Sequence, residues 1–107
     1  MANSKTEREE IDRSGGTPQK NSGRGKVNKG DAILGPFNFD VKEAQKSFTL
    51  NRSVWLKVCK DALQSGMYEP ALKVVIGQSG EPKTRLWVID DDTFQQMLGA
   101  WSRDGYQ

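Results

Sequence analysis

The sequence of 107 residues contains no histidine and a single cysteine, Cys59. The lack of histidine excludes Ser-His-Asp and Cys-His catalysis, and it excludes metal sites built on histidine. A lone cysteine excludes an intrachain disulfide and a cysteine-rich zinc site. A metal ion bound by this chain would therefore have oxygen ligands, which favours a hard cation such as Mg²⁺ or Mn²⁺.

Long hydrophobic runs are also missing. No apolar run approaches the ~18 residues of a membrane span, and the first residues contain no apolar segment of the kind that marks a secretory signal. We therefore expect no membrane partner and a cytoplasmic location. With 35% hydrophobic residues and a mass of 12.0 kDa, the chain predicts one domain over residues 1–107 with frayed ends at 1–3 and 102–107. So lean a core favours oligomerisation.

Acidic residues are scarce in two segments, although the net charge is only +2. Residues 13–29 contain five basic residues and no acidic one, and residues 42–60 contain five basic residues against Glu43. A polyanion would bind best to these two segments. The alternative is a solvated loop followed by an ordinary helix surface, and Lys57 and Lys60 are interpreted as solvated.

The hydrophobic pattern predicts an α/β fold in the order α-β-β-α-β-β-α, a small mixed sheet flanked by helices. Residues 17–30 have the composition of a linker, and Thr49 is the expected N-cap of the central helix. The predicted elements are a helix over 4–14, a hairpin of strands 31–34 and 37–42, a helix over 50–65, strands over 71–76 and 85–90, and a helix from 91 to about 101.

The strand over 37–42 carries the chemistry of greatest interest. Its alternation places Asp40 and Lys42 on one face, opposite the phenylalanines that fill the core. Asp31 begins the neighbouring strand and can approach Asp40 across the hairpin. Two converging carboxylates suit a divalent cation, and the lysine beside them suits the orientation of an attacking water or the neutralisation of a phosphate. The alternative is a solvated ion pair that contributes little.

Five short segments together resemble small phage-encoded nucleases of the PD-(D/E)XK group, which includes Holliday-junction-resolvase-like and homing-type endonucleases. The resemblance extends from about Glu7 to Phe94 and implies a restriction-endonuclease-like fold. The segments are Asn21-Ser22-Gly23-Arg24-Gly25, Lys29-Gly30-Asp31, Phe39-Asp40-Val41-Lys42, Lys46-Ser47-Phe48 and Glu69-Pro70-Ala71-Leu72.

The resemblance also implies roles for individual residues. Asp40 stands where many relatives have Glu, and its shorter side chain still offers a carboxylate. The implied positions are Asp31 and Asp40 as metal-binding acids, Lys42 as the catalytic lysine, the carbonyl of Val41 as a further metal ligand, and Glu7 as the acid of the first helix, with Glu10 as the alternative because both precede Gly15-Gly16.

Contacts to nucleic acid are expected from a glycine-rich loop and from the start of the central helix. The glycines would let the backbone approach phosphates, whereas the simpler interpretation is a flexible charged loop. The candidates are Ser22, Arg24, Lys26 and Lys29 in the loop, and Lys46 and Arg52 beside the helix.

The activity implied by the resemblance is that of a Mg²⁺-dependent endodeoxyribonuclease, with Mn²⁺ able to substitute. It would hydrolyse duplex or branched DNA to a 5′-phosphate and a 3′-hydroxyl, as a homodimer or higher homo-oligomer, in the host cytoplasm if the chain is phage-encoded. The alternative is a non-catalytic module that binds nucleic acid or inhibits a host nuclease. In an inhibitor, the acidic residues 90–92 would matter more than Lys42.

Overall fold

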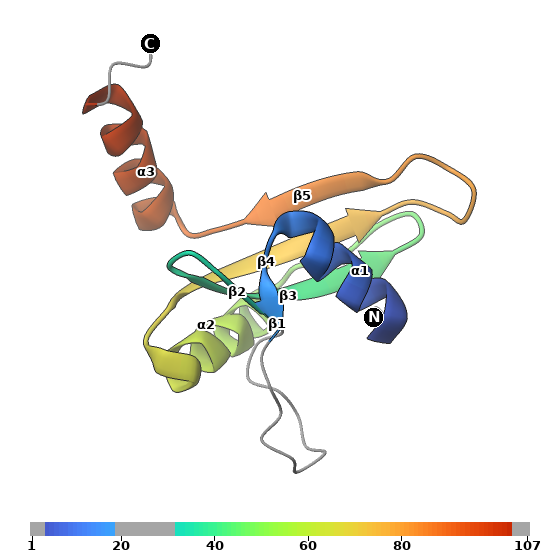
Figure 1. Ribbon diagram of the computed structural model, residues 1–107, viewed down its shortest axis with the longest axis horizontal. Helices are drawn as coiled ribbons and strands as arrows, with labels where there is room; N and C mark the ends of the chain where they lie inside the picture. The colour runs from blue at the N-terminus through green and yellow to red at the C-terminus, as the bar shows by residue number, and fades with distance from the viewer. Residues whose placement is uncertain (1–3, 19–31, 104–107) are drawn as a thin grey trace.

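Five strands form a mixed sheet with helices on both faces, in a computed structural model that describes residues 4–18 and 32–103 (Figure 1). The α/β fold class is therefore confirmed. The elements in chain order are α1 (Ser4–Ser14), β1 (Thr17–Pro18), β2 (Ala32–Leu34), β3 (Phe37–Ala44), α2 (Arg52–Gly66), β4 (Glu69–Ile76), β5 (Thr84–Val88) and α3 (Asp91–Arg103).

This order, α-β-β-β-α-β-β-α, contains one strand more than the sequence predicted. The extra strand β1 falls at the start of the segment that had been interpreted as a linker. It is only two residues long, so it carries no alternation that a periodicity argument could detect. The last helix also differs, because α3 continues to Arg103 and includes residue 102, which had been expected to fray.

The strands lie in the order β1-β2-β3-β4-β5. Only β3 and β4 run parallel, and α2 is the crossover that joins them. Such a parallel pair needs a connection long enough to return the chain to the same end of the sheet. In the register of the central strands, Asp40 lies beside Leu72 and Lys42 beside Val74.

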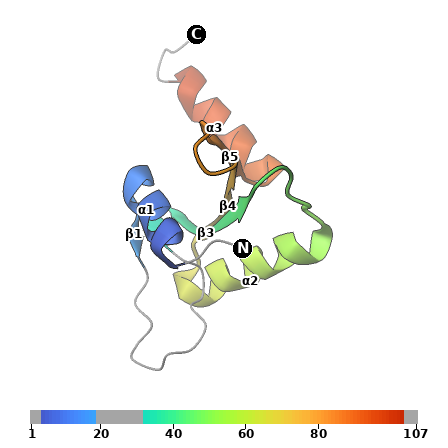
Figure 2. The same ribbon diagram turned by 90° about the vertical axis from the view of Figure 1, so that its right-hand side faces the viewer.

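The helices α1 and α2 cover opposite faces of the sheet (Figure 2). The face under α1 is packed around Phe39 and Val41 of β3, together with Ile11 of α1. On the face under α2, Val58 of the helix packs against Leu72 of β4. The alternation of β3 thus divides its side chains between two separate packing layers, as the sequence predicted.

Helix α2 begins and ends with clear capping interactions. The side chain of Asn51 accepts a hydrogen bond of 2.9 Å from the backbone N–H of Val54, so Asn51 is the N-cap and the prediction of Thr49 is wrong. At the other end, Met67 takes the left-handed conformation with φ of 63°. Its N–H reaches the carbonyl of Leu63, which satisfies a carbonyl of the last turn.

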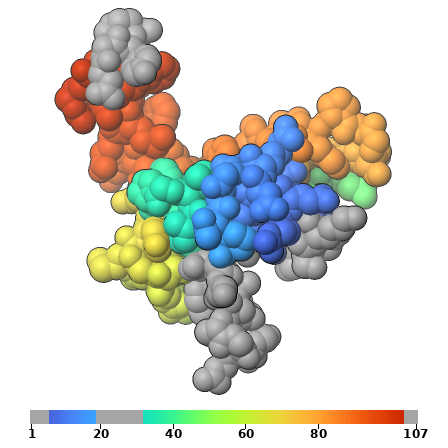
Figure 3. All heavy atoms as spheres, in the orientation of Figure 1, coloured from blue at the N-terminus to red at the C-terminus, as the bar shows by residue number. Residues whose placement is uncertain are grey.

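Helix α3 stands away from the body of the molecule (Figure 3). It begins directly after β5, and it leaves Trp87 on that strand 44% exposed. Trp87 is this exposed because β5 is an outer strand of the sheet. Across the described ranges, none of the helices combines the length and apolar character needed to span a membrane.

Candidate active site on the α2 face of the sheet

Asp40 and Lys42 lie on the same face of β3, as the alternation predicted. Their register neighbours on β4, Leu72 and Val74, belong to the packing layer under α2. The two side chains line a hollow of about 270 Å³. The carboxylate residue Asp40 is 8% exposed, so this acid stands in a partly closed site rather than on an open strand face.

The walls of the hollow come from the segment after β3 and from α2. Its lining residues are Asp40, Lys42, Phe48, Val54, Lys57 and Val58. Two lysines and one carboxylate therefore meet in a small space with apolar walls. Charge interactions are stronger in such a place than in open water because less solvent screens them.

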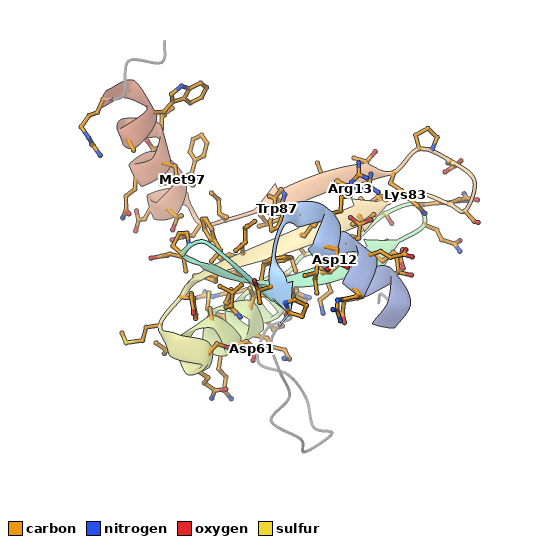
Figure 4. The ribbon with its side chains drawn as sticks, in the orientation of Figure 1. Asp12, Arg13, Asp61, Lys83, Trp87 and Met97 are labelled. Atoms are coloured by element: carbon orange, nitrogen blue, oxygen red, sulfur yellow. The ribbon has the colours of Figure 1, made fainter. Side chains whose placement is uncertain are left out.

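Lys57 also lines the hollow, and its side chain is largely exposed, as its interpretation as a solvated lysine predicted. Its ammonium group forms an ion pair of 2.9 Å with Asp61, one turn further along α2. The side chain of Asp61 is only 5% exposed, while that of Lys57 is 60% exposed. The buried acid thus holds the ammonium group of a lysine that also lines the hollow (Asp61 is labelled in Figure 4).

A signal for this lysine was present in the sequence. Lys57 and Asp61 are four residues apart, the spacing at which side chains meet on a helix. Both also border the apolar positions of Val58 and Ala62, which are buried. An ion pair at that spacing beside a buried stripe indicates a charge held close to the sheet.

Several predicted residues lie outside the described ranges. These are Asp31 and the four loop candidates Ser22, Arg24, Lys26 and Lys29. The hairpin that the sequence predicted is present as β2 and β3, with Ala32 paired to Phe39.

Glu10 lies on the other side of the sheet from Asp40 and Lys42. Its carboxylate accepts hydrogen bonds of 3.0 and 3.1 Å from Arg85 and forms an ion pair of 2.9 Å with Lys73. Burial acts to raise the pKa of Glu10, but the hydrogen bonds and charges of the two cations outweigh it and hold that pKa below its ordinary value. The structure does not bring Glu10 to the hollow.

Glu7 lies on the same helix, one turn before Glu10, and is partly buried. Because α1 covers the face opposite α2, the described geometry does not join Glu7 to Asp40 and Lys42 either. Within residues 4–18 and 32–103, no three acidic or cysteine side chains are close enough together to hold a metal ion.

The two basic candidates near α2 are both exposed. Lys46 lies in the connection from β3 to the helix, and Arg52 is the first residue of α2. Each is two residues away in sequence from a residue that lines the hollow, Phe48 and Val54 respectively. Neither cation is itself among the residues that line the hollow.

The described lining of the hollow offers few ligands for a hard cation. Asp40 supplies a carboxylate, and Val41, the predicted carbonyl ligand, is not among the lining residues. Among the described lining residues Asp40 is the one carboxylate. A second acid would have to come from outside them, and Asp31 is the predicted one.

A larger hollow of about 690 Å³ lies where β3 and β4 end, and it includes Glu43 and Lys83. The ammonium group of Lys83 donates hydrogen bonds of 3.0 and 3.4 Å to the carbonyls of Gly77 and Gln78. These bonds tie the lysine to the turn between β4 and β5, which is an adequate structural role for it. None of the predicted site residues lines this hollow.

Comparison of the chain with protein-family models gives no match, and no curated protein or solved structure matches it.

Proposed function

We propose that the protein is a metal-dependent endodeoxyribonuclease of the PD-(D/E)XK type. The observation that supports this proposal best is the placement of Asp40 and Lys42 side by side on β3, in a partly closed hollow that also holds Lys57. A mixed sheet with a crossover helix between the parallel strands β3 and β4 supports the proposal at the level of fold class.

The proposed reaction is hydrolysis of a phosphodiester bond. A water oxygen forms a new bond to phosphorus, the bond from phosphorus to the 3′ oxygen breaks, and the 3′ oxygen takes up a proton. A Mg²⁺ ion bound by Asp40, Asp31 and the Val41 carbonyl would supply a water of lowered pKa and would stabilise charge on the phosphate.

The lysines of the hollow carry the remaining roles. Lys42, next to the acid, holds and orients the attacking water and offsets negative charge as it develops on the phosphate. Lys57 contributes a second positive charge from the opposite wall, and Asp61 keeps that lysine in position through their ion pair.

DNA binding would involve the cations around the hollow. We propose that the exposed cations Lys46 and Arg52 contact phosphates, together with the loop residues Ser22, Arg24, Lys26 and Lys29. The substrate class is duplex or branched DNA, including four-way junctions. A protein of 12.0 kDa that cuts both strands would act as a homo-oligomer, in the host cytoplasm if phage-encoded.

Cleavage assays test this proposal directly. Labelled linear duplex, supercoiled plasmid and four-way junction DNA are incubated with the protein in Mg²⁺, in Mn²⁺ and in EDTA. We expect metal-dependent cutting that is lost in Lys42→Ala and Asp40→Asn variants that remain folded. Lys60→Ala is the matched control, since Lys60 is exposed on the same helix and does not line the hollow.

The pattern of cutting also distinguishes the narrower activities. Cutting of the junction alone would identify a resolvase, and one discrete cut in long duplex would identify a site-specific endonuclease. DNA that is bound but not cut under any condition would contradict the nuclease proposal and favour a non-catalytic binding module.

A further inference from the structure

Helix α3 carries a stripe of exposed apolar side chains. Its members are spaced three, four and seven residues from the first, so they share one side of the helix. Each of them is between 41% and 54% exposed. The stripe consists of Phe94, Met97, Leu98 and Trp101.

The stripe continues onto the body of the molecule. Met97 lines an apolar hollow of about 260 Å³ together with Leu34, Phe37 and Ile89. Trp87 lines the same hollow and is 44% exposed. Figure 4 shows Met97 on α3 and Trp87 on β5 on either side of the angle between the helix and the sheet.

The charged residues of α3 lie only at its two ends. Asp91 and Asp92 occupy the first turn and Arg103 the last position, and no charged residue stands between Asp92 and Arg103. This amphipathic helix of 13 residues is about 20 Å long. Such a face is stabilised by covering it with another apolar surface, because it is otherwise hydrated at a cost in free energy.

We propose that a second copy of this chain covers the stripe, through antiparallel pairing of the two α3 helices around a two-fold axis. The order of the stripe supports this occupant, because it reads aromatic, Met, Leu, aromatic. A two-fold axis between positions 97 and 98 places Phe94 of each copy against Trp101 of the other and Met97 against Leu98. An interface of this kind must be complementary to itself, and the stripe meets that condition.

The available area also fits a dimer. Phe94 and Trp101 are each about half exposed, and since an aromatic side chain offers about 150–250 Å², the two expose about 200 Å². Met97 and Leu98 add about 100 Å². Two copies would therefore bury about 600 Å² of apolar surface, the apolar share of an interface of about 1,000 Å², which reaches the lower limit for a specific complex.

The mass of the full-length protein in solution is the first test. Light scattering over a dilution series should give twice the chain mass of 12.0 kDa at high concentration. Leu98→Glu should weaken dimerisation by at least about a hundredfold, because the charge is introduced twice at the axis. Gln96→Glu, an exposed position on the other side of α3, should leave the dimer unchanged.

The geometry of the pair requires a second test. In a Cys59→Ser background, chains with Phe94→Cys are mixed with chains with Trp101→Cys and oxidised. Antiparallel pairing predicts that the mixed disulfide predominates, whereas two products that each join identical chains would overturn the arrangement.

A wild-type protein that remains monomeric at every concentration would overturn the proposal. A Leu98→Glu variant that stays dimeric would also overturn it. So would a Leu98→Glu variant with a lower melting temperature than a monomeric wild type, since the stripe would then be packed against its own sheet. All of these readouts are independent of DNA cleavage, so the dimer and the nuclease proposals can fail separately.

Discussion

Lys73 and Glu10 form an ion pair of 2.9 Å beneath α1, with side chains that are only 3% and 9% exposed. Arg85 adds two hydrogen bonds to the same carboxylate, and Lys73 also donates to the hydroxyl of Ser14 at 2.6 Å. The cluster therefore joins α1 to β4 and β5. A buried charge that loses its partner is costly, so α1 is held in one position relative to the strands.

Removal of one partner from this cluster should destabilise the protein strongly. We expect Glu10→Ala to lower the free energy of unfolding by about 3 kcal/mol, because Lys73 would be left buried without its acid. Urea unfolding measures the change. The matched control is Asp12→Ala, which breaks the exposed pair with Arg8 and should cost no more than about 0.5 kcal/mol. Equal effects of the two substitutions would contradict a structural role for the cluster.

The same cluster predicts a dependence of stability on pH. The pKa of Glu10 is lowered in the folded protein from its ordinary value of 4.5. Burial opposes this shift, but hydrogen bonds from Arg85 and Lys73 exceed it. The pKa of Glu10 is lower in the folded protein than in the unfolded chain. Its ionised carboxylate therefore contributes fully to the free energy of unfolding above about pH 4.5, and this contribution is lost as the pH falls through the pKa of the folded protein.

Urea unfolding at a series of acidic pH values measures this contribution. Glu10→Gln should show a smaller loss of stability below pH 4.5 than the wild type, because the variant has no proton to take up at that position. Parallel stability curves for the two proteins would show that Glu10 does not contribute.

Lys57 provides a test of the candidate site that the resemblance alone does not suggest. If the proposed nuclease activity is present, Lys57→Ala should reduce kcat/KM for DNA cleavage by about a hundredfold through the loss of charge stabilisation. Asp61→Asn should cause a smaller reduction, because the lysine remains but its position is no longer fixed. Lys60→Ala should change the rate less than about twofold, since an exposed surface cation contributes mainly through weak steering. Similar losses of kcat/KM in the Lys57 and Lys60 variants would show that both lysines act only through general electrostatic attraction of DNA.

Met67 offers a way to stabilise the protein. It is the one residue other than glycine with positive φ among the described residues, and its side chain is 81% exposed. Met67→Gly should raise the free energy of unfolding by about 0.5–1 kcal/mol, because glycine adopts this conformation without steric cost. Gln64→Gly, inside the same helix, should instead lower it by a similar amount. Thermal unfolding of both variants compares the two effects directly.

Local patterns predicted much of this fold. The alternation of residues 37–42 assigned Asp40 and Lys42 to one face, and the structure confirms that assignment. The bounds of the first helix were also correct. These predictions succeeded because periodicity and turn residues act between near neighbours in the chain.

Long-range contacts were beyond such reasoning. Lys73 lies in an apolar strand, and its partner Glu10 is 63 residues away in sequence. No local pattern links these two residues, so the cluster under α1 was not predicted and Glu10 was considered as a metal ligand instead. The exposure of Trp87 could not be predicted for a related reason, since the composition of a strand does not reveal that it lies at the edge of a sheet.

The two edges of the sheet differ in their capacity to accept another strand. At one edge, β1 is two residues long and includes Pro18, which has no N–H to donate and so discourages further pairing. At the other, β5 is the outermost strand of the described chain, with Leu86 and Trp87 both exposed. Unwanted self-association by strand addition would therefore begin at β5. Replacing Leu86 with a charged residue would disfavour such pairing.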